Sequence, residues 1–185
     1  MPRQLFVFDP PERFVAGTVG QPGDRTFYLQ ASGAGRTVSV ALEKSQVMVL
    51  AERLEELLEE VRRRGVGEVP DAAPLELEDT APLDAPVEEE FRVGTMGLAW
   101  DGSIAKVVVE ALAPPEGEGQ EDVEPLSDAE EGPDALRVVL TAEMAKAFIQ
   151  RAQRVVAAGR PPCPLCALPL DPDGHICPRQ NGHRR

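Results

Sequence analysis

Phe14-Val15-Ala16-Gly17-Thr18-Val19-Gly20 returns 77 residues later as Phe91-Arg92-Val93-Gly94-Thr95-Met96-Gly97. Both copies of this Phe-x-x-Gly-Thr-x-Gly motif are followed by further strand patterns and then by a helix pattern. The short connections between the strands favour antiparallel pairing, because parallel pairs need a long crossover. The sequence therefore predicts an α+β fold made of internally duplicated antiparallel strand-strand-strand-helix units, which form one pseudo-symmetric domain.

One amphipathic helix is expected in each half. The first has Ser45 as its N-cap and ends at Gly65, with apolar residues at Val47, Leu50, Leu54, Leu58 and Val61. The second has Thr141 as its N-cap and ends at Gly159, with Met144, Phe148, Ala152 and Val155 facing inward. One face of each helix is therefore expected to cover a sheet.

The pattern divides the chain into five parts. Residues 1–65 form the first repeat, whose extra N-terminal strand, residues 4–9, is expected to join an antiparallel meander. Residues 66–90 are an acidic linker, and residues 91–159 are the second repeat, which carries an acidic insert at 114–134. Residues 160–185 are predicted to form a small zinc ribbon.

The net charge of −13 is concentrated in the linker and the insert. Each contains nine acidic residues and no basic one, so the rest of the chain has fourteen acids against nineteen bases. Such acidic segments rich in Pro and Gly are typical of solvated linkers. The alternative is that they fold back over a basic surface and compete there with an anionic partner.

The zinc prediction rests on a cluster at the end of the sequence. Every cysteine and histidine of the protein lies within residues 163–183. We expect the ligands to be Cys163, Cys166, His175 and Cys177, with His183 as the alternative to His175. Four protein ligands leave no coordination position for water, which makes the zinc structural rather than catalytic. Iron, a metal-free thiol cluster and redox switching of the thiolates are the alternatives.

The composition also bears on location. The longest apolar run, residues 47–51, is far too short to cross a bilayer, and the first residues do not have the pattern of a signal peptide. Three cysteines clustered with histidines favour metal binding in a reducing compartment. We therefore expect a cytoplasmic protein that does not contact a membrane.

Other candidate sites have weaker patterns. The glycines at 17, 20, 94 and 97 lack the strand-loop-helix setting of a phosphate-binding loop and favour a bulge or a strand crossing. Carboxylates and arginines in loops could instead serve a hydrolase: Asp9, Glu12, Arg13, Asp24 and Arg25. Nucleic acid could contact the basic residues of the ribbon, Arg160, Arg179, Arg184 and Arg185, although no aromatic residue there could stack on a base.

The chain resembles a family of uncharacterised actinobacterial proteins with a domain of unknown function. The residues that carry this resemblance are Phe8–Gly20, Arg25–Ala31, Leu42–Val47, Cys163–Cys166, Gly174–Pro178, Asn181 and Gly182. It excludes the two acidic segments, and it implies an actinobacterial cytoplasmic source without a mechanism. Members often have Tyr at the position of His183, which favours His175 as the ligand.

The leading hypothesis is a non-enzymatic binding or adaptor module that recognises a protein partner and contains a structural zinc. The alternative from another class is the loop-carboxylate hydrolase. Contact with nucleic acid through the ribbon is a third possibility, which the sequence does not favour.

Overall fold

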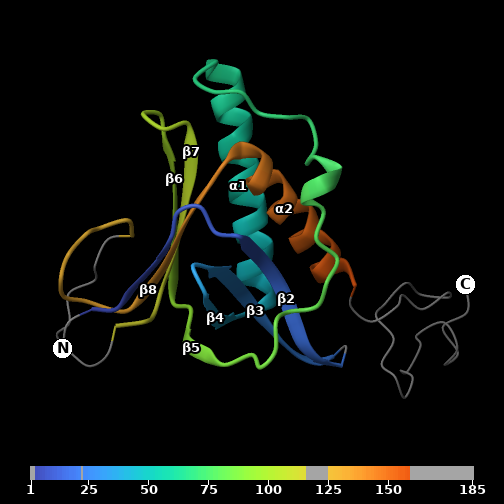
Figure 1. The fold of residues 1–185 in the computed structure, drawn as a ribbon, viewed down its shortest axis with the longest axis vertical. Coiled ribbons are helices and arrows are strands. Elements are labelled where there is room, and N and C mark those ends of the chain that lie inside the picture. The colour runs from blue at the N-terminus through green and yellow to red at the C-terminus, as the bar shows by residue number, and fades with distance from the viewer. Residues whose placement is uncertain (1–2, 22, 116–124, 159–185) are drawn as a thin grey trace, which may run out of the picture.

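The computed structural model describes residues 3–21, 23–115 and 125–158. Within these ranges the chain forms two four-stranded sheets and two long helices, so the α+β prediction is confirmed. Figure 1 shows the two helices crossing each other beside the sheets. Neither helix is both long enough and apolar enough to cross a membrane.

The elements follow the same order in each half of the chain. The first half contains β1 (Leu5–Phe8), β2 (Arg13–Gln21), β3 (Asp24–Gly33), β4 (Arg36–Leu42) and α1 (Lys44–Arg64). The second half contains β5 (Glu89–Arg92), β6 (Thr95–Asp101), β7 (Lys106–Leu112), β8 (Ala135–Leu140) and α2 (Ala142–Ala157). A short 3-10 helix, η1 (Leu75–Leu77), lies in the linker between them.

The first strand of each half completes the sheet of the other half. One sheet has the order β2-β3-β4-β5 and the other has the order β1-β8-β7-β6. β1 runs parallel to β8, and β5 runs parallel to β4, whereas the other neighbours are antiparallel. The prediction that residues 4–9 join a meander of the first half is therefore wrong, because β1 crosses to the second sheet (Figure 1).

The hydrophobic core lies between the inner faces of the sheets and the helices. It contains alternating strand residues, such as Leu29 and Val109, and the apolar face of each helix. Phe14 of β2 stacks on Phe148 of α2, with ring centroids 4.6 Å apart. All five apolar residues predicted to lie on one face of α1 are buried.

The helix boundaries confirm two predictions and correct one. Gly65 ends α1 in the left-handed conformation, with φ of 66°, which glycine adopts readily. Thr141 is the N-cap of α2 and accepts a hydrogen bond from Met144 N at 3.1 Å. The N-cap of α1 is Glu43 instead of Ser45, because Gln46 at the third helical position accepts a bond from Glu43 N at 2.8 Å. Gly159 lies outside the described residues.

Replacing Phe148 with Ala should remove the stacked pair that joins α2 to β2 in the core. We expect Phe148→Ala to lower the free energy of unfolding by about 3–5 kcal/mol, because the surrounding side chains fill such a cavity only in part. Val66→Ala is the control, since Val66 is 54% exposed and should change the value by no more than about 0.5 kcal/mol. Urea denaturation followed by circular dichroism measures both, and equal effects would contradict this description of the core.

Candidate functional site

The predicted metal ligands lie outside the described residues. Cys163, Cys166, His175, Cys177 and His183 all follow residue 158. Within the described part of the chain, no group of three or more histidine, cysteine, aspartate or glutamate side chains gathers at distances that could hold a metal ion. The zinc site therefore stays a prediction from the sequence.

The loop residues proposed for a hydrolase do not meet in one pocket. Glu12 and Arg13 line the same cavity, between α2 and β2. Asp9 lies elsewhere, where its Oδ1 is 3.8 Å from Lys106 Nζ. Arg25 stacks on Phe27 and donates a hydrogen bond to the carbonyl oxygen of Ala158. The fifth residue, Asp24, is exposed where β3 begins.

Asp79 in the acidic linker connects two arginines of the body. Its carboxylate accepts hydrogen bonds from Arg13 Nε at 2.6 Å and from Arg151 Nη1 at 3.0 Å. Arg151 also donates to the backbone oxygen of Ala16, at the outer edge of β2. The hydrogen bond from Arg13 holds the pKa of Asp79 below its ordinary value, and burial lowers the pKa of Arg151. This part of the linker is therefore bound to a basic surface, as the alternative interpretation of the acidic segments expects.

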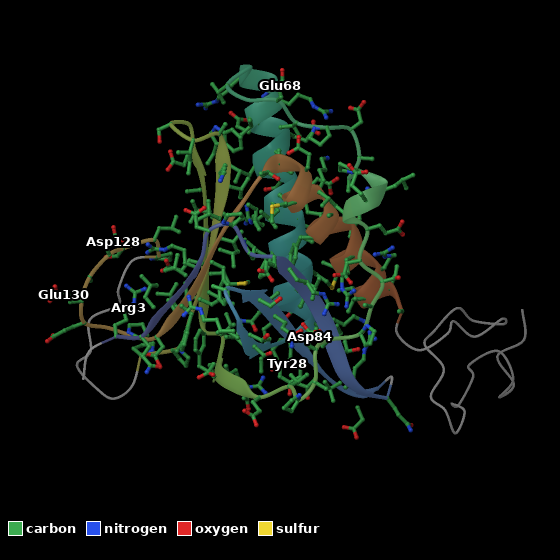
Figure 2. The ribbon with its side chains drawn as sticks, in the orientation of Figure 1. Arg3, Tyr28, Glu68, Asp84, Asp128 and Glu130 are labelled. Carbon is green, nitrogen blue, oxygen red and sulfur yellow. The ribbon has the colours of Figure 1, made fainter. Side chains whose placement is uncertain are left out.

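A buried amide fixes the next part of the linker on the outer face of the first sheet. Gln30 of β3 is 1% exposed, and its side chain exchanges two hydrogen bonds with the backbone of Asp84. The neighbouring Leu83 covers Gly17, where an added Cβ would lie 2.5 Å from a methyl carbon of Leu83. Figure 2 labels Asp84 of the linker and Tyr28 of β3. Gly17 therefore makes room for the linker, as a crossing predicts.

A buried carboxylate has the same role in the second sheet. Glu110 of β7 is completely buried and pairs with Arg3 at 3.1 Å and with Arg137 at 2.7 Å. It also accepts a hydrogen bond from the backbone nitrogen of Leu126, in the second acidic insert. A side chain on Gly97 of β6 would overlap the adjacent Pro125. Figure 2 places Arg3 beside this insert, near Asp128 and Glu130.

An open groove runs between α1 and β6. It has a volume of about 560 Å³, and its lining includes Val49, Leu50 and Arg53 of α1 with Thr95, Met96 and Leu98 of β6. We call it the α1/β6 groove. Among the described residues, β6 pairs with β7 alone and leaves its other edge without a strand partner. Apart from Asp101 at its end, the strand has none of the charged residues and prolines that commonly protect an exposed edge.

The cavity between α2 and β2 is the internal counterpart of this groove. Met144, Ala147, Phe148 and Arg151 line it, and they lie 98 residues after four residues that line the α1/β6 groove: Gln46, Val49, Leu50 and Arg53. The same offset of 98 relates β4 to β8 in the sequence, where Val38–Leu42 corresponds to Leu136–Leu140. The two surfaces therefore occupy corresponding places in the two halves.

The two counterparts differ in what covers them. Leu77 and Asp79 of the linker lie in the α2/β2 cavity, of which about 80 Å³ stays open. The covered Arg151 has a side chain that is 7% exposed. Arg53 of the α1/β6 groove is 68% exposed, and Val49 beside it is 46% exposed. The sequence patterns did not indicate the α1/β6 groove. Whether this surface is open depends on which of the two corresponding surfaces the linker covers.

The carboxylate of Asp79 should make the stability of the wild type depend on pH, and a neutral residue at this position should remove that dependence. The folded pKa is lowered, so the stability that the carboxylate contributes is present above its unfolded pKa of about 3.9 and is lost as pH falls through the folded value. We expect Asp79→Asn to cost about 1–3 kcal/mol at pH 7, because charged hydrogen bonds to two arginines are lost. The difference from the wild type should shrink as the pH falls below about 4.

Asp71→Asn is the control for this measurement, because Asp71 belongs to the same linker but its side chain is 97% exposed. It should change stability by no more than about 1 kcal/mol. Urea unfolding curves recorded between pH 3 and pH 7 compare the variants. A cost for Asp79→Asn that stays constant over this range would contradict the role given to the carboxylate.

Comparisons with known proteins identify one family. A family model described as "Protein of unknown function (DUF3090)" matches residues 6–177, which is most of the chain. No curated protein and no solved structure matches the sequence.

Proposed function

The chain belongs to the family of proteins of unknown function DUF3090, and we propose that it is a non-enzymatic, cytoplasmic binding protein with a structural zinc in its C-terminal tail. The observation that carries this proposal is the α1/β6 groove: an apolar opening beside a strand edge that lacks a partner among the described strands. An extended segment of a protein partner can add to such an edge through backbone hydrogen bonds, while its side chains enter the groove.

The rest of the body supports binding rather than catalysis. In the α2/β2 cavity the carboxylate of Asp79 is held by both Arg13 and Arg151. Buried Glu110 is likewise held by two arginines. A general acid or base needs a proton that it can exchange with a substrate, and these ion pairs serve packing instead.

The chain itself indicates the chemistry of a suitable partner. Leu75-Glu76-Leu77-Glu78-Asp79 runs past the counterpart cavity, where Leu77 contributes an apolar side chain and Asp79 a carboxylate to an arginine. The α1/β6 groove has an apolar floor and Arg53 at the corresponding position. We therefore propose that the partner presents an apolar side chain followed two residues later by a carboxylate, as Leu77 and Asp79 do in the counterpart cavity.

A synthetic peptide of residues 73–82 tests this surface. We expect it to shift the backbone amide NMR signals of residues 95–98 in the full-length protein. Val49→Asp should weaken this binding at least tenfold, because it places a charge in the apolar groove.

Ile104→Asp is the matched control. Ile104 is 48% exposed, nearly the same as Val49, but it lies in the turn between β6 and β7, outside the residues that line the groove. This variant should bind the peptide as the wild type does. Equal binding by Val49→Asp and the wild type would place the binding surface elsewhere.

The proposed zinc has its own test, which does not depend on the groove. We expect one zinc ion per chain, measured by inductively coupled plasma mass spectrometry after gel filtration. Cys163, Cys166, His175 and Cys177 would supply two knuckles of two ligands each, which suits a tetrahedral ion. His175→Ala should therefore lose the metal, whereas His183→Ala should retain it. The reverse result would replace His175 with His183 in the ligand set.

A further inference from the structure

We propose that β6 pairs with β6 of a second copy of this chain, in the antiparallel direction and around a two-fold axis that passes beside Leu98. The inference rests on the proposed function in one respect, since both take the open edge of β6 as a surface that binds an extended strand. It goes further by identifying a second copy as an occupant of that edge. Three observations support it: the protection of the other edges, the position of Arg53, and the self-complementarity of β6.

The first observation is that other edge strands of the described sheets are protected. The edge strands are β1, β2, β5 and β6. β1 has four residues, and the carbonyl oxygen of Val7 accepts a hydrogen bond from Arg36 Nη2 at 2.7 Å. β5 also has four residues, three of which are charged: Glu89, Glu90 and Arg92. Short edge strands, charged side chains and occupied backbone groups all hinder the addition of another strand.

The second observation is a difference between two corresponding arginines. Arg151 of α2 donates a hydrogen bond to the carbonyl oxygen of Ala16 at 2.8 Å, so a side chain occupies the edge of β2. Arg53 of α1 lies 98 residues before Arg151 and lines the groove beside β6. Its side chain is 68% exposed and pairs with Glu56 of the same helix at 3.4 Å. The arginine that protects the edge of β2 therefore has a counterpart that points elsewhere at β6.

The third observation is the strand itself. β6 has seven residues without a proline, and its one charged residue, Asp101, stands at the end. The side chains that pack on the core alternate along it: Met96, Leu98 and Trp100. Gly97 and Ala99 therefore lie on the other face of the sheet. A strand of this length and composition is suited to pairing along its open edge.

β6 is self-complementary in the antiparallel direction. A register centred on Leu98 places all seven residues of one strand opposite the seven of the other. Leu98 then lies opposite Leu98, and Met96 of each copy lies opposite Trp100 of the second copy. Such cross-strand pairs of large apolar side chains stabilise a sheet. A slip by one residue would place these side chains opposite Gly97 and Ala99, on the wrong face.

The same register keeps like charges apart. Asp101 of each copy lies opposite Thr95 of the second copy, and a threonine hydroxyl can donate a hydrogen bond to a carboxylate. The two aspartates stand at opposite ends of the strand pair, about 20 Å apart at about 3.4 Å per residue. The two-fold axis repeats the contact between Thr95 and Asp101, so one substitution at Thr95 changes two contacts.

Pairing would also cover part of the α1/β6 groove. A two-fold axis perpendicular to the sheet keeps the core-facing side chains of both copies on the same face, where the groove lies. Leu98 of the second copy would lie beside Val49, which is 46% exposed in the single chain. A protein partner would have to displace the second copy. The concentration of the chain would therefore regulate access to the groove by mass action.

Sedimentation velocity of the full-length protein tests the inference. One strand pair is a small interface, so we expect a monomer at about 1 µM and a dimer at about 500 µM. Thr95→Asp should weaken the dimer about tenfold, because it places like charges opposite each other at two contacts. Thr95→Lys should strengthen it, because the ammonium group lies opposite Asp101. A monomer at every concentration, or equal association of the two variants, would overturn the inference.

Thr37→Asp is the matched control for Thr95→Asp. Thr37 is also an exposed threonine near the start of a strand, but it belongs to β4 of the other sheet. The two variants have the same net charge, so general repulsion between chains affects both equally. Thr37→Asp should associate as the wild type does, and a dimer weakened equally by both substitutions would place the interface elsewhere.

Hydrogen exchange identifies what occupies the edge. We expect alternate backbone amides of residues 95–101, those that point away from β7, to exchange at least fivefold more slowly at about 500 µM than at about 1 µM. Thr95→Asp should reduce this difference. Protection that does not depend on concentration would show that another segment of the same chain covers the edge, and would overturn the inference.

The peptide of residues 73–82 separates this inference from the proposed function. Its binding is measured at about 1 µM protein, where the chain should be a monomer. Peptide binding by a protein that stays monomeric at every concentration would overturn the inference and leave the proposed function. A dimer that Thr95→Asp weakens, together with no peptide binding, would overturn the proposed partner and leave the inference.

Discussion

The structure depends on the burial of one carboxylate at the centre of the second sheet. Glu110 is completely removed from water, and a buried charge left without partners would cost several kcal/mol. Arg137 reaches it from the adjacent strand, and Arg3 reaches it from the residues that precede β1. The requirement for Arg3 holds β1 beside β8, and the requirement for a backbone donor holds Leu126 over the sheet. One ionised group thus organises three distant segments of the chain.

The first sheet also buries a polar side chain at its centre, but this side chain is neutral. Gln30 takes the central place there, and the two hydrogen bonds of its amide are enough to hold the linker at Asp84. A neutral amide costs less to bury than a carboxylate does, so this sheet needs no arginine at its centre. Each acidic segment therefore contacts a sheet at one point, the linker at Asp84 and the insert at Leu126. The negative charges that give the protein its net charge are, in part, compensated by arginines of the body.

The sequence predicted those features that depend on local patterns. The apolar periodicity placed both helices, and the Thr141 cap and the Gly65 end follow from backbone chemistry at single residues. The position of β1 could not be predicted in this way, because Leu5 pairs with Ala135 across the whole chain. Composition alone also did not reveal that Arg13 binds the carboxylate of Asp79 or that Gln30 binds the backbone of Asp84.

In the candidate site, too, local sequence patterns predicted some features, whereas features that depend on distant contacts could not be predicted. The motif with Gly17 and Gly97 indicated a crossing, and the structure identifies Leu83 and Pro125 as the residues that cross. The α1/β6 groove had no signature in the sequence, because Val49 and Leu98 have the same apolar character as residues of the core. What distinguishes them is that the linker covers one of two equivalent surfaces and leaves the other open.

The pairing of Leu5 with Ala135 sets an order of events during synthesis. The ribosome makes β1 about 130 residues before its partner β8, which at about 5–20 residues per second corresponds to a wait of about 7–26 s. The first sheet waits for less of the chain, since β5 follows β4 within the next 50 residues. The nascent protein must therefore keep Phe6 and Phe8 from pairing wrongly until almost the whole body has emerged. The second sheet can therefore be completed only after β8 has been synthesised.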